Sequence, residues 1–338
     1  MAADDEGRDR AARGLVFEAP RRVASSPLDL GSPGEGDILV HTLWSGISGG
    51  TEMLAYRGEI DPALPLDETI GVLGGSFAFP FRYGYSCVGR AEHARGDIPD
   101  GQLVFAFHPH QDAFVVAADD VVVLDDIDPR LATMFPLVET ALQVALDAGP
   151  VLEQPVAVMG LGAVGILTGL MLQRAGARVL GIEPLEERRA IAATVGLESV
   201  APEEAAEVIA TDAPSGLPLV VEVSGRPEAL RGALPLLAHE GEALVVSWYG
   251  TKDVHLPLGA EFHRRRLRIR STQVSTIPGA LAASWSRDRR RAVVRELLHA
   301  LPLTPLATHS YPFDRAGEAF AAVDRGDAGL VHAALCYM

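Results

Sequence analysis

Short apolar runs separated by turn residues fill the first third of the chain. Four runs carry β-branched and aromatic residues and are bounded by Gly, Pro and Asp. They are residues 36–44, 84–94, 101–108 and 112–125. This pattern is typical of strands in a compact sheet. Because no long stretch with helical spacing occurs between residue 14 and about residue 124, we expect a mostly β domain there.

The pattern then changes. Residues 129–149 carry apolar residues at helical spacing, and Gly149-Pro150 ends that predicted helix. Strand and helix signals alternate from there to "LRIRS" (267–271). Such alternation predicts a parallel sheet with helices on both faces. The closing segment predicts one more helix followed by a strand.

A glycine-rich turn follows the first strand of the alternating region. "VAVMGLGAVG" places Gly160, Gly162 and Gly165 in a G-x-G-x-x-G spacing. These glycines permit a tight turn, a close approach of the backbone to a pyrophosphate, and close packing of helix on strand. The N-terminus of the next helix offers free N–H groups to phosphates. The segment therefore predicts a dinucleotide site, with a glycine-rich turn that binds no ligand as the alternative.

Glu183 ends the second strand of this unit, 21 residues after Gly162. A carboxylate there can accept hydrogen bonds from both ribose hydroxyls and repels a 2′-phosphate, so we expect NAD(H) rather than NADP(H). Arg188 is a candidate for covering the adenine or ribose. The candidate cofactor contacts are Gly160, Leu161, Gly162, Ala163, Val164, Gly165, Glu183, Arg188, Ser224 and Gly225.

Charge and apolar content narrow the partners and the compartment. With 45 acidic and 29 basic residues the net charge is −16, which argues against nucleic-acid and membrane partners. We interpret the basic clusters 263–270 and 287–291 as solvated faces. The longest apolar run, 156–172, is too short and glycine-rich for a membrane span. Two cysteines and a start without an apolar leader favour a cytoplasmic protein.

Three segments resemble the medium-chain dehydrogenase/reductase superfamily: "GEGDILVHTLWSGIS", "MGLGAVGILTGLMLQRAGARVLGIEPLEERRAIAATVG" and "YPFDRAGEAFAAVDRGDAG". The resemblance extends from Gly14 to the C-terminus. It implies an α/β fold with a GroES-like β domain and a Rossmann domain built on a doubly wound parallel sheet. The implied boundaries are a flexible tail (1–13), a GroES-like catalytic domain (14–140), a Rossmann domain (141–273) and a C-terminal return to the catalytic domain (274–338).

The chain departs from zinc-dependent members of that superfamily at all three zinc-ligand positions. Those members carry a Cys in "GIC", a His in "GHE" and a third Cys or Glu. Here Ser48 stands in "GIS", Tyr85 in "YGYS" and Glu139 in "LVETAL". A hydroxyl and a phenol are poor zinc ligands at neutral pH, so the resemblance implies no catalytic zinc and no other metal.

The stretch "SGISGGTE" predicts a tight turn that delivers oxygen groups to a pocket rather than to a core. By the resemblance it lies where zinc relatives keep a ligand and a proton-relay hydroxyl. We expect Tyr85 to donate the proton in ketone reduction, Ser48 and Thr51 to relay it, and Glu52 to orient them or act as a base. The alternative is that Tyr85 only fills the space left by zinc.

His108 and His110 form an H-x-H pair in "FHPHQ". No convincing third ligand stands nearby, so metal binding, a pocket or proton-relay role, and a structural role stay open. His110 is the rival to Tyr85 as the proton donor. The resemblance places Phe107, His108 and Glu139 at the substrate pocket.

"SGISGGTE", "PHQ" and "ETAL" together resemble a zinc-lacking subgroup that includes a bacteriochlorophyll-pathway dehydrogenase acting on a hydroxyethyl side chain. This implies a zinc-independent, NAD(H)-dependent oxidoreductase that interconverts a small-molecule secondary alcohol and a ketone by hydride transfer. An NAD(P)H-dependent reductase of an activated C=C bond and a non-catalytic NAD-binding protein stay open. Members of the superfamily commonly pair through the edge strand of the Rossmann sheet, so the resemblance implies a homodimer joined at residues 267–274, which alternate as an edge strand does.

Overall fold

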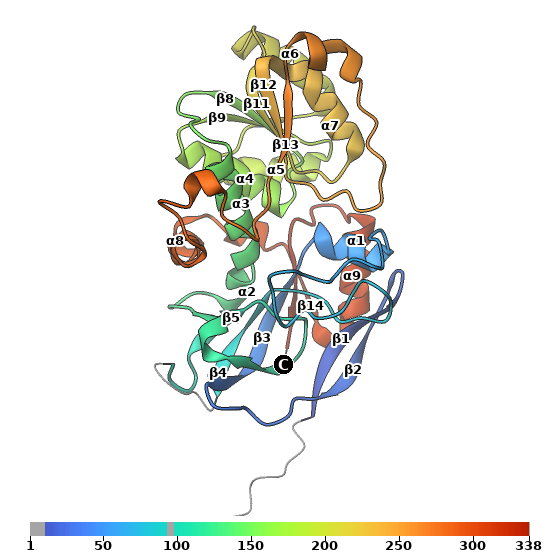
Figure 1. The fold of residues 1–338 in the computed structure, drawn as a ribbon, viewed down its shortest axis with the longest axis vertical. Helices are drawn as coiled ribbons and strands as arrows, with labels where there is room; N and C mark the ends of the chain where they lie inside the picture. Colours follow the sequence, from blue (N-terminus) through green and yellow to red (C-terminus); the bar gives the residue numbers. More distant parts are fainter. Residues whose placement is uncertain (1–10, 93–97, 338) are drawn as a thin grey trace, which may run out of the picture.

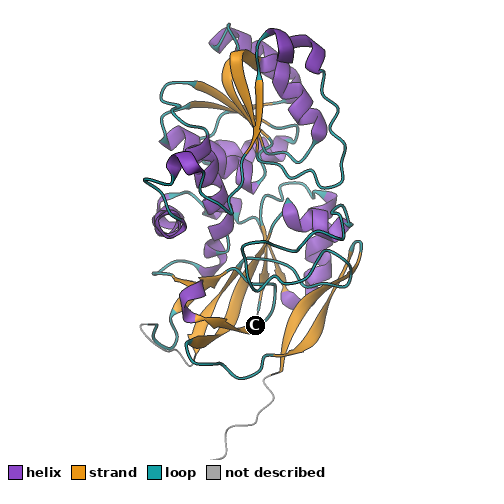
Figure 2. Cartoon of the chain, viewed as in Figure 1, coloured by secondary structure: helices purple, strands orange, loops and turns teal. Residues whose placement is uncertain are grey.

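The computed structural model describes residues 11–92 and 98–337 of the chain. Two bodies stack along its long axis, a β-rich body at the bottom of Figure 1 and an α/β body at the top. Helix α3 runs between them, and the C-terminal part of the chain returns to the lower body (Figures 1 and 2). The predicted α/β fold class is confirmed.

The lower body is built on a seven-stranded sheet in the order β14-β15-β3-β4-β5-β7, with β6 paired to β3. Its strands are β3 (Asp37–Ile47), β4 (Cys87–Glu92), β5 (Leu103–Ala106), β6 (Ala113–Ala117), β7 (Val121–Val123), β14 (His309–Pro312) and β15 (Ala333–Cys336). Strand β15 lies antiparallel to β3, with Ala333 opposite Ile47. Strand β15, near the C-terminus, therefore extends the sheet that β3 begins.

A hairpin and two helices cover this sheet. They are β1 (Ala11–Ala19), β2 (Arg22–Asp29), α1 (Thr51–Arg57) and α9 (Ala316–Arg325). Their shared core is aromatic: Phe17 stacks on Phe81 with ring centroids 5.2 Å apart and meets Phe320 edge-on at 5.4 Å. Neither the hairpin nor α1 was expected from the apolar pattern, because polar residues interrupt that pattern in all three segments.

Some expected boundaries differ in the structure. Residues 11–13, assigned to a flexible tail, begin β1, where the N–H of Arg13 donates to Asp112 Oδ1 at 2.7 Å. Residues 1–10 of that tail, and residues 93–94 of the predicted strand 84–94, lie outside the described residues. The single helix predicted over 129–149 is two, α2 (Pro129–Ala132) and α3 (Phe135–Asp147), with a break at residues 133–134.

The upper body contains six parallel strands in the order β10-β9-β8-β11-β12-β13. They are β8 (Pro155–Met159), β9 (Arg178–Ile182), β10 (Ser199–Val200), β11 (Leu217–Glu222), β12 (Leu237–Val245) and β13 (Arg268–Ser271). In chain order this is 3-2-1-4-5-6, the arrangement of doubly wound dinucleotide-binding sheets.

Helices cover both faces of that sheet. They are α4 (Ala163–Arg174), α5 (Glu186–Thr194), α6 (Pro202–Asp212) and α7 (Pro227–Ala233), while α3 packs on α4 and α8 (Arg287–Ala300) packs on α3. Along β8, Val156 and Val158 pack in the core with α3, α4 and α8, whereas Ala157 and Met159 pack with α6 and α7. This alternation explains why the strand reads as a continuous apolar run. Within the described residues, no helix has the length and apolarity that a bilayer crossing requires.

Candidate active site

The stretch 45–52 is more buried than its small and polar residues suggest. Ser45 and Ile47 lie at the end of β3, Gly49 and Gly50 make the turn, and α1 begins at Thr51. Ser45 and Glu52 have no exposed surface. The expectation of a stretch outside the core is therefore wrong for these residues, because β3 and α1 carry them inside the lower body.

Tyr85 precedes β4 and is half-buried. Burial raises the pKa of its phenol, and the nearby Glu52 carboxylate raises it further. The side chains of Ser48 and Thr51 act in the opposite direction and lower the pKa of the phenol, but the net pKa stays well above that of a free tyrosine. Tyr85 is therefore a neutral O–H group with two hydroxyls ready to support a partial negative charge.

Glu52 lies behind this group with its carboxylate fully enclosed. Its Oε1 accepts the backbone N–H of Ser48 at 2.9 Å, and its Oε2 is 2.8 Å from Nε2 of His110. His110 is also fully buried, and its Nδ1 is 2.7 Å from the hydroxyl of Ser45. Both ring nitrogens are thus engaged inside the protein, an arrangement that favours a relay or positioning role for His110 over direct contact with a substrate.

The other predicted pocket residues are held by different partners. His108 stacks on Phe114 with ring centroids 3.9 Å apart, and burial lowers its pKa to about 4. Its neighbour Phe107 is half-buried beneath the guanidinium of Arg291, 4.9 Å away. The two histidines of the H-x-H pair therefore face separate partners. Phe107 remains the more open of the two predicted pocket residues on this segment.

Glu139, at the third position that resembles a zinc ligand, is tied to a buried arginine. Nε of Arg290 donates to Glu139 Oε1 at 3.0 Å, and its other nitrogens donate to Gln143 Oε1 and the carbonyl of Val274, both at 2.6 Å. Arg290 is only 2% exposed. The interpretation of residues 287–291 as a solvated face is therefore wrong for Arg290, because α3 and α8 enclose its charge between them.

These donors do not fit a catalytic zinc. Ser48 and Tyr85 present hydroxyls rather than a thiolate or an imidazole, and the carboxylate of Glu139 is neutralised by Arg290. Across residues 11–92 and 98–337, no three His, Cys, Asp or Glu side chains are grouped closely enough to hold a metal ion. Zinc prefers thiolate, imidazole or free carboxylate ligands.

The glycine-rich turn fits a dinucleotide. Gly160 has φ +96°, and a Cβ there would lie 2.7 Å from Cα of Ser224. A Cβ on Gly165 would lie 1.9 Å from the carbonyl oxygen of Gly160, whereas one on Gly162 would meet nothing within 4 Å. No side chain caps the N-terminus of α4. The turn therefore packs closely on its protein side and is open at Gly162, as a pyrophosphate cradle requires.

Glu183 borders this cradle. Its carboxylate accepts the N–H of Leu161 at 2.7 Å and the N–H of Leu185 at 3.1 Å, which fixes it beside the turn. Arg188 points elsewhere, toward the carbonyl of Leu330 at 3.4 Å. The structure thus gathers Glu183 with the glycines but does not bring Arg188 to them, and Arg188 stays a prediction as a cofactor contact.

The carboxyl ends of β11 and β12 add a second polar group. Ser224 donates to Glu222 Oε1 through both its N–H and its hydroxyl, and Tyr249 donates to the other oxygen at 2.6 Å. The N–H of Gly225 donates to Ser247 at 2.8 Å. Sequence reasoning missed Glu222, although it ends β11 and Glu183 directly follows β9, a repeat that was available as a signal.

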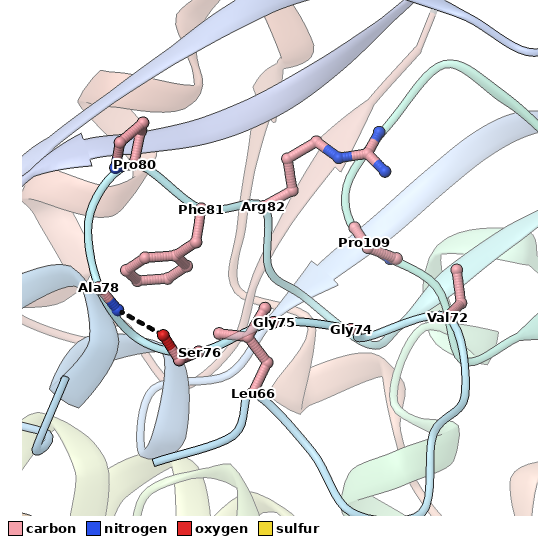
Figure 3. A pocket seen from close by; sticks show the side chains of 10 residues that line it. All are labelled: Leu66, Val72, Gly74, Gly75, Ser76, Ala78, Pro80, Phe81, Arg82 and Pro109. Atoms are coloured by element: carbon pink, nitrogen blue, oxygen red, sulfur yellow. Dashed lines mark hydrogen bonds between the residues drawn. The ribbon is translucent and has the colours of Figure 1, made fainter. Parts of the chain in front are cut away.

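The two bodies touch beside the predicted site. The N–H of Thr251 donates to the carbonyl of Glu59 at 2.9 Å, and the rings of Phe77 and Trp248 lie 6.1 Å apart. A pocket of about 230 Å³ opens further out in the 66–82 loop. Figure 3 shows Arg82 extending there toward the loop that carries Pro109. None of the predicted catalytic residues lines this pocket.

Comparison with known proteins shows that the chain is similar to dehydrogenases. A family model described as zinc-binding dehydrogenase matches residues 163–287. The 2-desacetyl-2-hydroxyethyl bacteriochlorophyllide A dehydrogenase of Cereibacter sphaeroides is 27% identical over 91% of this chain and 92% of its own length. The D-guloside 3-dehydrogenase of Escherichia coli K12 is 24% identical over 84% of this chain and 87% of its own.

Solved structures show the same fold at lower identity. An E. coli oxidoreductase/dehydrogenase of unknown specificity superposes with a TM-score of 0.78 and 16% identity, covering 97% of this chain and 99% of its own. A zinc-binding dehydrogenase from Sinorhizobium meliloti bound to NADP gives 0.75 at 18% identity, and an E. coli CFT073 alcohol dehydrogenase complexed with NADH gives 0.76 at 15%. Each covers 96% of this chain and 99% of the other.

Proposed function

Because the chain belongs to the medium-chain dehydrogenase/reductase superfamily and is an oxidoreductase of that type, we propose that it interconverts a secondary alcohol and a ketone with NAD(H) and without zinc. The observation that carries the proposal is the environment of Tyr85. A neutral phenol, two supporting hydroxyls and a buried carboxylate stand where zinc relatives hold their metal by resemblance. That group can supply the proton that ketone reduction consumes.

Support for a nicotinamide cofactor comes from the cradle at Gly160–Gly165 and from two superposable structures, one bound to NADP and one to NADH. When bound, such a cofactor supplies or accepts the hydride. The open backbone at Gly162 and the uncapped N-terminus of α4 would hold the pyrophosphate. Glu183, fixed by two backbone N–H groups, would accept from the ribose hydroxyls and disfavour a 2′-phosphate.

The proton is handled by this chain's own residues. In the reducing direction Tyr85 donates its proton to the oxygen of the substrate, which would otherwise become an alkoxide. Ser48 and Thr51 then donate to the phenolic oxygen and stabilise the charge left on it. In the oxidising direction the same groups take the proton back. Glu52 fixes the turn by accepting the Ser48 N–H.

The substrate class follows from the relatives and from this donor set. The two similar full-length proteins are named as dehydrogenases of a hydroxyethyl group and of a guloside at position 3. Both names fit oxidation of a secondary alcohol, and a phenol positioned to protonate an oxygen suits a ketone better than an activated C=C bond. A small-molecule substrate is therefore proposed, with no nucleic-acid or membrane partner.

The replacement Tyr85→Phe tests this proposal. Loss of the donor should lower turnover about a hundredfold or more while NADH affinity, measured by fluorescence titration, stays within about twofold. Tyr83→Phe is the matched control, since Tyr83 is a buried neighbour two residues away that we assign no role. If Tyr85→Phe turns over as fast as the parent, Tyr85 only fills space and the proposed proton donor is wrong.

A further inference from the structure

A row of buried polar groups continues inward from Glu52 to the last strand of the lower body. Nε2 of His110 is 2.8 Å from Glu52, Nδ1 is 2.7 Å from the hydroxyl of Ser45, and that hydroxyl is 2.8 Å from the hydroxyl of Tyr337. Ser45, Glu52 and His110 are each 0% exposed. Four hydrogen-bonding groups from β3, α1, the 107–112 segment and the end of β15 thus form one unbranched chain.

The chain starts from a group that keeps its proton and can donate it. Burial raises the pKa of Tyr337 well above that of a free tyrosine, so its hydroxyl keeps its proton. In the described residues the only hydrogen-bond partner of that hydroxyl is Ser45. A phenol is more acidic than an alcohol hydroxyl and is the better donor of the two, so Tyr337 donates to Ser45. The hydroxyl of Ser45 is then free to donate to Nδ1 of His110.

The other end of the chain needs a donor. Glu52 is a fully buried carboxylate, and within residues 11–92 and 98–337 no arginine or lysine pairs with it. Its hydrogen-bond partners there are the N–H of Ser48 and Nε2 of His110. An enclosed carboxylate is stable only when hydrogen-bonded. This requires a proton on Nε2, and it leaves Nδ1 as the acceptor that Ser45 satisfies.

We propose that Tyr337, Ser45 and His110 form a one-directional donor chain that points at Glu52 and makes Ser45 and Tyr337 positioning residues for the Tyr85 proton donor. The chain fixes His110 as the neutral Nε2–H tautomer. That tautomer holds Glu52 against the Ser48 N–H and so keeps the hydroxyls of Ser48 and Thr51 on Tyr85. The role in turnover rests on the proposed function, whereas the direction of the chain does not.

The groups around Glu52 and His110 are uncharged and do not oppose the direction of donation from Tyr337 to Glu52. The ring of His110 meets Phe320 of α9 edge-on at 5.9 Å, and Gly84 lies against its other side. The titratable groups that interact with Glu52 or His110 are Tyr83, Tyr85, Cys87, His108 and Tyr337. All but His108 have a raised pKa and stay neutral, and the pKa of His108 is lowered so that it is neutral too.

The ¹⁵N spectrum of histidine-labelled full-length protein tests the direction without any substrate. His110 is assigned by the loss of its signals in His110→Gln. We expect Nε2 of His110 to carry the proton at pH 7.5 and Nδ1 to show the shift of a hydrogen-bonded acceptor. In Ser45→Ala the Nδ1 signal should move to the position of a free imine nitrogen, and in Tyr337→Phe it should move part of that way.

Turnover provides the second readout. Turnover should fall about tenfold in Ser45→Ala and less in Tyr337→Phe, with the Michaelis constant and NADH affinity unchanged, because the hydrogen bonds lost lie behind the donor. Tyr311→Phe on the neighbouring strand β14 is the matched control and should change neither readout. A proton on Nδ1 in the parent, or equal losses in Tyr337→Phe and Tyr311→Phe, would overturn the proposal. A correct tautomer without turnover in any variant would count against the enzyme function alone.

Discussion

His108 and His332 are neutral histidines held inside the protein. Burial lowers the pKa of each to about 4. His332 contacts the hydroxyl of Thr133 through Nε2 at 3.1 Å, and its Nδ1 has no partner in the described structure. The folded protein therefore keeps both rings neutral at pH values where the unfolded chain protonates them, that is, below about pH 6.5.

This predicts loss of stability in mild acid. Below about pH 6.5 the unfolded chain binds a proton at each histidine that the folded protein does not bind until about pH 4. Each histidine should therefore remove roughly 3 kcal/mol of unfolding free energy between those pH values, and nothing above pH 7. Urea denaturation at pH 7.5, 6 and 5 measures the slope. The variant His332→Asn should show a smaller change of unfolding free energy with pH. An equal change in that variant would mean that His332 is not one of the histidines responsible.

Glu183 predicts the choice of cofactor. Its carboxylate is 3% exposed and fixed beside the glycine turn, where it repels a 2′-phosphate. NAD(H) should bind tighter than NADP(H) by about 1–3 kcal/mol, and Glu183→Gln should narrow that difference. Titrating both reduced cofactors by fluorescence decides it. Equal affinity, or tighter NADPH, would mean that Arg188 or Arg189 leaves its backbone carbonyl partners to bind the phosphate.

Residue roles set by local spacing could be predicted from the sequence, and those set by folding could not. The spacing of Gly160, Gly162 and Gly165 and the position of Glu183 are local, and the structure brings them together. Ser45 and Tyr337 are 292 residues apart in the chain, and no pattern in either segment pairs them. The polar composition of residues 45–52 also led to the wrong expectation that Glu52 lies outside the core. A carboxylate can be buried when distant segments of the chain supply its hydrogen-bond partners.

At the scale of elements, the junction of α3 and α8 depends on one buried ion pair. Arg290 on α8 joins Glu139 and Gln143 on α3 to the carbonyl of Val274. Arg290→Met should lower the unfolding free energy by about 3–5 kcal/mol, since it leaves the Glu139 charge buried without a partner. Thermal or urea unfolding measures this loss.

A double variant and a control sharpen that test. Glu139→Gln combined with Arg290→Met should be less damaging than Arg290→Met alone, because no uncompensated charge remains. Arg289→Met, next along the helix and stacked on Trp285 with its guanidinium 4.6 Å from the ring, should cost under about 1 kcal/mol. If Arg289→Met and Arg290→Met prove equally mild, the pair does not hold the two helices together.

The elements that were predicted well are those with a long, regular pattern. The six parallel strands and their helices appear where alternation of signals placed them. The 129–149 helix is split because Pro136 has no N–H for the carbonyl of Ala132 and its ring would clash with that carbonyl, so α3 starts anew with this proline in its first turn. The run "RDRRR" reads as polar at every position, so its composition could not reveal that one arginine faces inward.

At the scale of the whole molecule, β13 is the exposed edge of the six-stranded sheet. Its unpaired backbone groups offer a surface for the same strand of a second copy. The homodimer predicted through residues 267–274 remains a prediction. Light scattering at micromolar concentration should give twice the chain mass of 35.8 kDa. A monomer under those conditions would contradict it.

In the proposed function, hydride transfer with NAD(H) takes place at a site where a phenol and two hydroxyls stand in place of zinc. The direct measurement is NAD-dependent oxidation of a panel of secondary alcohols, sugars and cyclitols by protein dialysed against a chelator, with zinc determined on the same sample. We expect turnover of at least one substrate at the undialysed rate with under about one-tenth of a zinc per chain. Turnover that disappears on dialysis and returns with one zinc per chain would contradict it.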